Sequence, residues 1–129
     1  MINILDTNII LRFIVGDNEE QKIKARKIFL DAEKGKINLQ IKTVVIAEAC
    51  YVLESFYKKE REEIANSMEV FLSQKWLKVE DRLPLTSMWR WYREKLHFVD
   101  SFLVASSKFN KYRILSFDKK LTKKIEANS

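Results

Sequence analysis

The stretch that decides the fold reads INILDTN and covers residues 2–8. Residues 2–5 predict a short strand, which stops at the polar residues Asp6, Thr7 and Asn8. A short helix is then expected to run through Ile14. A strand that leads directly into a helix is typical of the alternating α/β class, so this class is our first expectation.

Strand-like and helical patterns go on alternating along the rest of the chain. Short strands are predicted at 37–41, 76–79 and 112–116, with longer helical patterns between them. Asp17 and Glu20 predict a capping box at the start of the second helix, and Thr43 is expected to cap the third. The alternation predicts a central parallel sheet flanked by helices on both faces. A length of 129 residues predicts one domain.

Composition supports a packed domain and excludes several classes of site. Hydrophobic residues make up 47% of the chain, which a disordered protein would not reach. A single Cys rules out a disulfide scaffold and a multi-cysteine zinc site. A single His, His97, makes a His-based metal site improbable. The net charge of +6 suits a polyanionic partner, either nucleic acid or an acidic protein.

The N-terminal region shows no pattern of a targeting signal. Residues 1–15 are interrupted by Asp6, Asn8 and Arg12, without a basic start or a small-residue cleavage site. No run approaches 18 uninterrupted apolar residues, so a membrane-spanning helix is not expected. A cytoplasmic location is the resulting expectation.

Three aspartates stand where the predicted elements change, and a fourth carboxylate, Glu48, lies within a predicted helix. Asp6 and Asp118 follow predicted strands and Asp100 opens a helix, so each could simply cap a helix. Glu48 interrupts the apolar run 44–53, which predicts a helix buried on nearly all sides. Because an isolated buried charge is very costly, Glu48 needs either a Lys or Arg partner or a cation. The residues alone leave both alternatives open.

The four acids are more informative together than singly. A parallel sheet gathers the ends of its strands at one edge, where ligands bind in open α/β folds. Carboxylates without His or Cys are ligands for a hard cation such as Mg²⁺ or Mn²⁺. Such a cation activates water and stabilises the leaving oxygen of a phosphodiester. An acidic metal pocket in a basic protein therefore predicts a nuclease.

Four ordered motifs extend this pattern along essentially the whole chain. They read ILDTN at 4–8, VIAE at 45–48, FVDSFLVA at 98–105 and ILSFDKKL at 114–121. With these motifs the sequence strongly resembles PIN domains, and among them the VapC-type toxins of toxin–antitoxin pairs. Val99 and Ser101 stand where many relatives have Ala, but neither change removes a metal ligand.

The resemblance implies one PIN domain over residues 1–129 and a defined set of site residues. The implied metal ligands and catalytic groups, around one or two Mg²⁺ or Mn²⁺ ions, are Asp6, Glu48, Asp100 and Asp118. The implied supporting polar groups are Thr7, Asn8 and Ser116.

The same resemblance implies an activity and partners. PIN toxins cleave RNA, commonly in tRNA or ribosomal RNA, and a VapB-type antitoxin blocks their site. It also implies a homodimer. Two other functions stay open: a PIN ribonuclease in RNA processing without a toxin role, and a silent RNA- or protein-binding PIN module. Without the motifs, a phosphotransfer domain that uses Asp clusters and Mg²⁺ would be a further alternative.

Basic residues near the motifs are candidates for contact with RNA. They are Arg12, which follows the first motif, and Lys119, Lys120 and Lys123, which follow Asp118. A solvated helix face is the structural alternative for the lysines. Contact with phosphates predicts binding that weakens with salt.

Aromatic residues around position 90 are candidates for base stacking. Trp89, Trp91 and Tyr92 lie at a spacing that favours core packing for Trp91 and Tyr92. Trp89 is then the residue of the three expected to be exposed.

Overall fold

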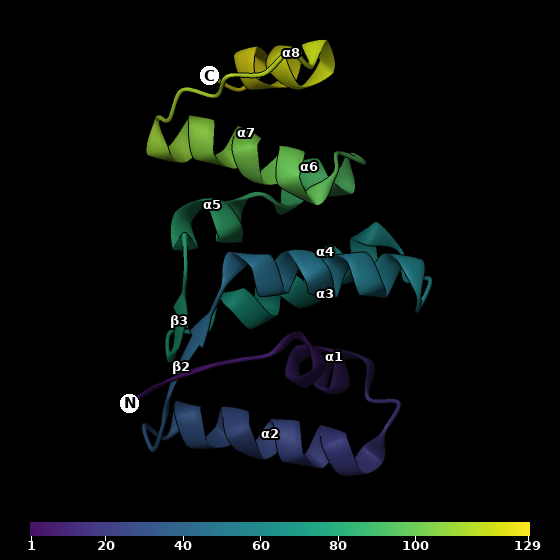
Figure 1. Cartoon of the computed structure of the whole chain (residues 1–129), viewed down its shortest axis with the longest axis vertical. Helices are drawn as coiled ribbons and strands as arrows, with labels where there is room; N and C mark the ends of the chain where they lie inside the picture. Colours follow the sequence, from purple (N-terminus) through teal and green to yellow (C-terminus); the bar gives the residue numbers. More distant parts are fainter. The chain divides into compact units, whose positions relative to one another are not determined.

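The computed structural model describes all 129 residues, which divide into two units, Met1–Glu80 and Asp81–Ser129 (Figure 1). All strands belong to the first unit, and the second unit is helical. No helix in either unit is both long enough and apolar enough to span a lipid bilayer.

Three short strands form the sheet of the first unit. They pair in the order β1-β2-β3, all parallel, with Leu39 opposite both Asn3 and Leu77. Parallel neighbours need crossover connections, and helices provide them here. The α/β class and the parallel sheet are thereby confirmed. The strands are β1 (Ile2–Ile4), β2 (Asn38–Ile41) and β3 (Leu77–Val79).

Four helices connect these strands, two in each crossover. Helix α1 packs against α2 and α3, and α3 packs against α4. Between α1 and α2 the chain turns at Gly16, whose φ of 67° lies in the left-handed region that glycine adopts without strain. The helices are α1 (Thr7–Val15), α2 (Glu19–Glu33), α3 (Thr43–Ser55) and α4 (Arg61–Leu72).

The predicted capping box at the start of α2 is wrong. Asn18 is the N-cap residue, and its side chain accepts a hydrogen bond from the Gln21 amide at 3.0 Å. Asp17 instead accepts hydrogen bonds from Arg12 at 3.0 Å and from the Tyr57 hydroxyl at 3.2 Å. Asp and Asn are comparable caps, so tertiary partners for Asp17 decide which residue takes the position.

Helix α3 is exposed along one side, which corrects the expectation of an all-round buried helix. Val44 and Tyr51 are 74% and 69% exposed, and the exposed Glu48 lies on the same face between them. The opposite face is buried through Ile46 and Leu53. The excess of apolar residues therefore does not report burial at Glu48.

The start of α3 is capped by Glu80, which directly follows β3, and not by Thr43. Lys42 occupies the N-cap position without a side-chain cap, and Thr43 is the first helical residue. The Thr43 amide donates to Glu80 Oε1 at 3.1 Å, and Lys42 Nζ donates to Glu80 Oε2 at 3.2 Å. These hydrogen bonds, first that of the Thr43 amide, lower the pKa of Glu80 below its usual 4.5.

The second unit is built around helix α7. This helix packs against α5, α6 and α8. Trp89 is fully buried, and its Nε1 donates to the Leu85 carbonyl at 2.9 Å. The expectation of an exposed Trp89 is therefore wrong. The helices are α5 (Arg82–Ser87), α6 (Trp89–Arg93), α7 (Phe98–Asn110) and α8 (Lys119–Ala127).

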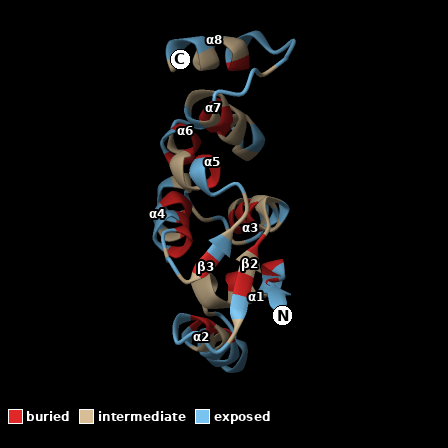
Figure 2. Ribbon diagram, turned by 90° about the vertical axis from the view of Figure 1, so that its left-hand side faces the viewer, coloured by how far each residue is buried: buried red, intermediate tan, exposed pale blue.

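Residues 112–116 do not form the predicted fourth strand. They form no ladder with another strand and are mostly exposed, as the colouring of the stretch between α7 and α8 shows (Figure 2). A strand needs a partner for its backbone groups, and the second unit contains no other strand. The alternation of apolar residues in this stretch is therefore not sufficient by itself to form a strand.

Candidate functional site

Asp6 lies in the turn between β1 and α1. Its φ and ψ of −82° and 154° place it as the N-cap residue of α1, and the Ile9 amide donates to its backbone carbonyl at 3.1 Å. Its side chain makes no capping hydrogen bond and is exposed. The capping alternative therefore explains the backbone of Asp6 but leaves its carboxylate available to a ligand.

Glu48 lies in the second turn of α3, which begins directly after the carboxyl end of β2. Because β1 and β2 are parallel, Asp6 and the start of α3 belong to the same edge of the sheet. Glu48 forms no ion pair with Lys or Arg, so the salt-bridge alternative is not what the structure shows.

Asp100 and Asp118 belong to the second unit. Asp100 lies in the first turn of α7, and His97 holds the N-cap position that was expected for Asp100. Asp118 does cap α8: its Oδ1 accepts hydrogen bonds from the Lys120 and Leu121 amides at 2.9 and 3.0 Å. The second carboxylate oxygen takes no part in this cap, so capping and metal binding are compatible at Asp118.

The supporting polar residues have different surroundings. Ser116 Oγ accepts a hydrogen bond from the Asp118 amide at 3.0 Å, which fixes the turn before α8. Thr7 is buried directly after Asp6, and Asn8 is exposed beside it. Ser116 thus acts on the position of Asp118.

The four acids differ from other aspartates of the chain in lacking cationic partners. Asp17 and Asp31 are paired with Arg12 and Lys27 at 3.0 and 3.1 Å. No Lys or Arg forms an ion pair with any of the four acids. Unpaired carboxylate oxygens are the donor set that Mg²⁺ and Mn²⁺ prefer, so the residues fit such an ion.

The two units divide the four acids equally. Asp6 and Glu48 belong to Met1–Glu80, and Asp100 and Asp118 to Asp81–Ser129. Neither unit contains by itself three His, Cys, Asp or Glu side chains that are placed to hold a metal ion.

The four predicted RNA contacts separate into two kinds. Arg12 is committed to its ion pair with Asp17, and its Nε is buried without a hydrogen-bond partner. Lys119, Lys120 and Lys123 are exposed and form no ion pair. The lysines are thus available to an anion.

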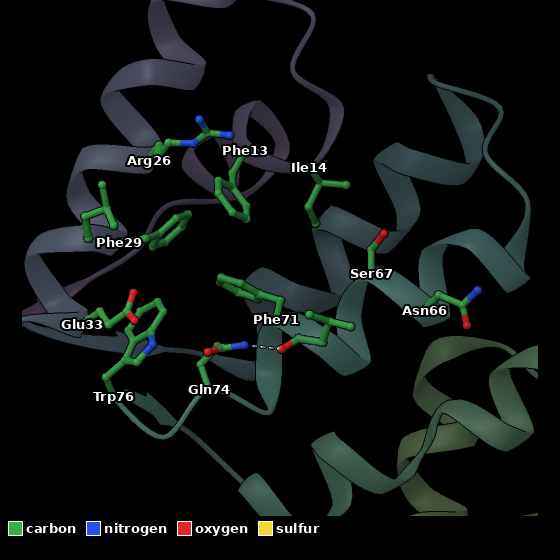
Figure 3. A pocket seen from close by; sticks show the side chains of 12 residues that line it. Phe13, Ile14, Arg26, Phe29, Glu33, Asn66, Ser67, Phe71, Gln74 and Trp76 are labelled. Atoms are coloured by element: carbon green, nitrogen blue, oxygen red, sulfur yellow. Dashed lines mark hydrogen bonds between the residues drawn. The ribbon is translucent and has the colours of Figure 1, made fainter.

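The first unit contains an aromatic groove of about 700 Å³ between α1, α2 and α4 (Figure 3). Four aromatic rings line it. The centroid of the Phe29 ring lies 4.7 Å from that of Phe13, 5.4 Å from that of Phe71 and 6.1 Å from that of Trp76. None of the four acids lines it. The groove is therefore lined by residues other than the four acids.

Two notable residues, Glu80 and Phe117, were not singled out from the sequence. Glu80 was missed because its partner, Thr43, is 37 residues away. Phe117 was named only as part of the motif ILSFDKKL, with no role of its own, yet it is as exposed as in an extended chain, at 106%. Its position between Ser116 and Asp118, both polar, was the available signal.

The chain is similar in sequence to known proteins. The sequence matches the PIN domain family over residues 4–126, which spans both units. It is 36% identical over 81 residues to a VapC ribonuclease of Aquifex aeolicus (strain VF5). This similarity covers 61% of the chain and 58% of that relative. No solved structure matches the chain significantly.

Proposed function

Because the chain belongs to the PIN-domain family, we propose that it is a metal-dependent endoribonuclease that hydrolyses RNA phosphodiester bonds. The observation that carries this proposal is the set of four carboxylates without any ion-pair partner. Since the family match spans both units, we also propose that residues 1–129 form one PIN domain.

In this proposal the four carboxylates bind the cation, and neighbouring polar residues keep the carboxylates in position. Asp6, Glu48, Asp100 and Asp118 would ligate Mg²⁺ or Mn²⁺, directly or through water. A bound cation of this kind supplies Lewis-acid chemistry, which makes water more acidic and offsets charge on a phosphate. The Ser116 hydroxyl accepts a hydrogen bond from the Asp118 amide and so keeps Asp118 in place. Thr7 and Asn8 would support the turn at Asp6. The exposed Lys119, Lys120 and Lys123, and less directly Arg12, would contact RNA.

We propose a toxin role on the strength of the relative's name, VapC ribonuclease. The corresponding partners would be tRNA or ribosomal RNA, a VapB-type antitoxin and a second copy of the chain in a homodimer. A PIN ribonuclease of RNA processing would share the chemistry but would not need an antitoxin. Growth arrest on expression, relieved by a co-expressed small protein encoded next to it, distinguishes the toxin from the processing enzyme.

The nuclease is tested by incubating total RNA with the purified chain in Mg²⁺, Mn²⁺ or EDTA. Cleavage is expected with either metal and not with EDTA, and sequencing the new ends identifies the target. Asp6→Asn should abolish cleavage, while Asp31→Asn, which changes an aspartate held by Lys27, should leave it intact. Cleavage that survives EDTA or Asp6→Asn would contradict the proposal. RNA binding without cleavage would instead favour a silent module.

A further inference from the structure

The net positive charge of the protein arises from one short segment. The first unit has 13 basic and 13 acidic side chains, whereas the second has 11 basic and 5 acidic ones. Residues 108–124 alone contain 7 basic side chains and one acid, Asp118. The whole net charge of +6 therefore arises in this segment, and the rest of the chain is neutral.

Most of these cations have no partner within the protein. Lys108 Nζ donates to the Asn128 carbonyl at 3.1 Å, and Lys124 pairs with Glu94 at 3.0 Å. The remaining five are exposed and form neither an ion pair nor a side-chain hydrogen bond. Unneutralised cations at this density attract a polyanion such as a nucleic-acid backbone. The five residues are Lys111, Arg113, Lys119, Lys120 and Lys123.

An exposed aromatic ring lies in the middle of this segment. Phe117 is 106% exposed, although neighbouring hydrogen bonds hold its turn in place. The Asp118 amide donates to Ser116 Oγ, and Asp118 Oδ1 accepts from the Lys120 amide. The ring is therefore presented to solvent from an ordered turn directly beside a candidate metal ligand.

Phe117 is the most exposed aromatic ring of this segment, and Tyr112, between Lys111 and Arg113, is a second one at 62% exposure. Trp89, Trp91 and Tyr92 are fully buried. Phe56 is exposed, but its ring packs edge-on against Tyr57 at 4.9 Å, and it belongs to the neutral unit. Unpaired bases stack on exposed aromatic rings while basic side chains follow their phosphates. Phe117 with its surrounding cations has this combination.

We propose that residues 111–123 form the RNA-binding surface, in which the Phe117 ring stacks on an unpaired base and the five cations bind the adjoining phosphates. The identity of the polyanion as RNA rests on the proposed function. The proposal adds a positioning residue to it, because a base held on Phe117 fixes which nucleotide lies beside Asp118.

The aromatic contact is tested by fluorescence anisotropy in EDTA, with the full chain and a labelled single-stranded RNA of about 12 nucleotides. Phe117→Ala and Phe117→Leu should each weaken binding about tenfold or more, and Phe117→Trp should keep it. Phe56→Ala, which removes an exposed ring from the neutral unit, should leave it unchanged. Binding by Phe117→Leu that equals that of the unaltered protein would overturn the stacking role, since leucine preserves apolar packing.

The cationic contact is tested with charge-matched triple variants. Lys119→Gln, Lys120→Gln and Lys123→Gln together should reduce the slope of log K against log salt by about 2, from about 0.7 for each lost phosphate contact. The control combines Lys34→Gln, Lys36→Gln and Lys75→Gln, exposed lysines of the neutral unit, and should retain the slope. An equal loss in both triples would mean that only the overall charge matters, which would overturn the assigned surface.

A competitor without bases separates the two contacts. Inorganic polyphosphate should compete less well for the triple lysine variant but equally well for Phe117→Ala, because it has phosphates and no rings. Binding that depends on Phe117 and the lysines, with no cleavage in metal, would leave this surface standing and reject the nuclease. Cleavage by a chain whose RNA binding ignores these variants would reject the surface alone.

Discussion

At the scale of single residues, unpaired carboxylates carry the functional argument. Asp6 occupies a helix N-cap position without using its side chain, and Glu48 stays exposed on a mostly apolar helix. The sequence predicted Asp118 as a cap correctly, because that cap bonds only to the two amides that follow it. It could not predict Glu80 as a cap, because the partner comes from another element.

Glu80 gives a prediction for stability against pH. Its pKa is lowered by the Thr43 amide and by Lys42, so its ionised form stabilises the fold. That contribution is present above the usual pKa of 4.5 and is lost as pH falls through the lowered value. Glu80→Gln should therefore lower the free energy of unfolding in urea at neutral pH, and the difference should vanish in strong acid.

The matched control for Glu80 is Glu126→Gln, an exposed glutamate of α8. Its unfolding free energy should follow that of the unaltered protein at every pH. A destabilisation by Glu80→Gln that persists unchanged in acid would show that packing, and not the charge, is what Glu80 contributes.

At the scale of elements, hydrophobic periodicity in the sequence located the three strands of the sheet. The strands predicted at 2–5, 37–41 and 76–79 correspond to β1, β2 and β3 within a few residues. The strand predicted at 112–116 does not form, because strand pairing depends on a neighbour that a local pattern does not specify. The exposed side of α3 was missed for the same reason: which face is buried depends on what packs against it.

The aromatic groove gives a prediction at this scale. Phe29 is buried in α2 and contacts rings from α1, α4 and the turn before β3. Phe29→Ala should lower the free energy of unfolding by about 3–5 kcal/mol, since it leaves a cavity among these rings. Phe56→Ala, at an exposed position, should cost less than about 1 kcal/mol. Chemical denaturation of both variants measures this, and equal losses would contradict the assigned core.

At the scale of the whole molecule, charge and chemistry are distributed unevenly between the units. The first unit is neutral and holds the sheet, Asp6 and Glu48, while the second holds the entire charge excess, Asp100 and Asp118. The family match runs through both. The sequence motifs predict the four acids together, because their order along the chain is a property of the family, whereas the metal centre itself stays a prediction.

The central claim is that the ordered acidic motifs serve metal-dependent RNA cleavage, with Glu48 and Asp100 acting together, and a double-mutant comparison of RNA cleavage in Mn²⁺ tests it most directly. Glu48→Gln and Asp100→Asn should each lower kcat/KM by about a hundredfold or more, since even the loss of a group that holds a metal ligand costs about 10- to 100-fold. Since residues that act as one unit are not additive, the double variant should be no slower than the slower single variant. Losses that multiply, or full activity in either single variant, would contradict the claim.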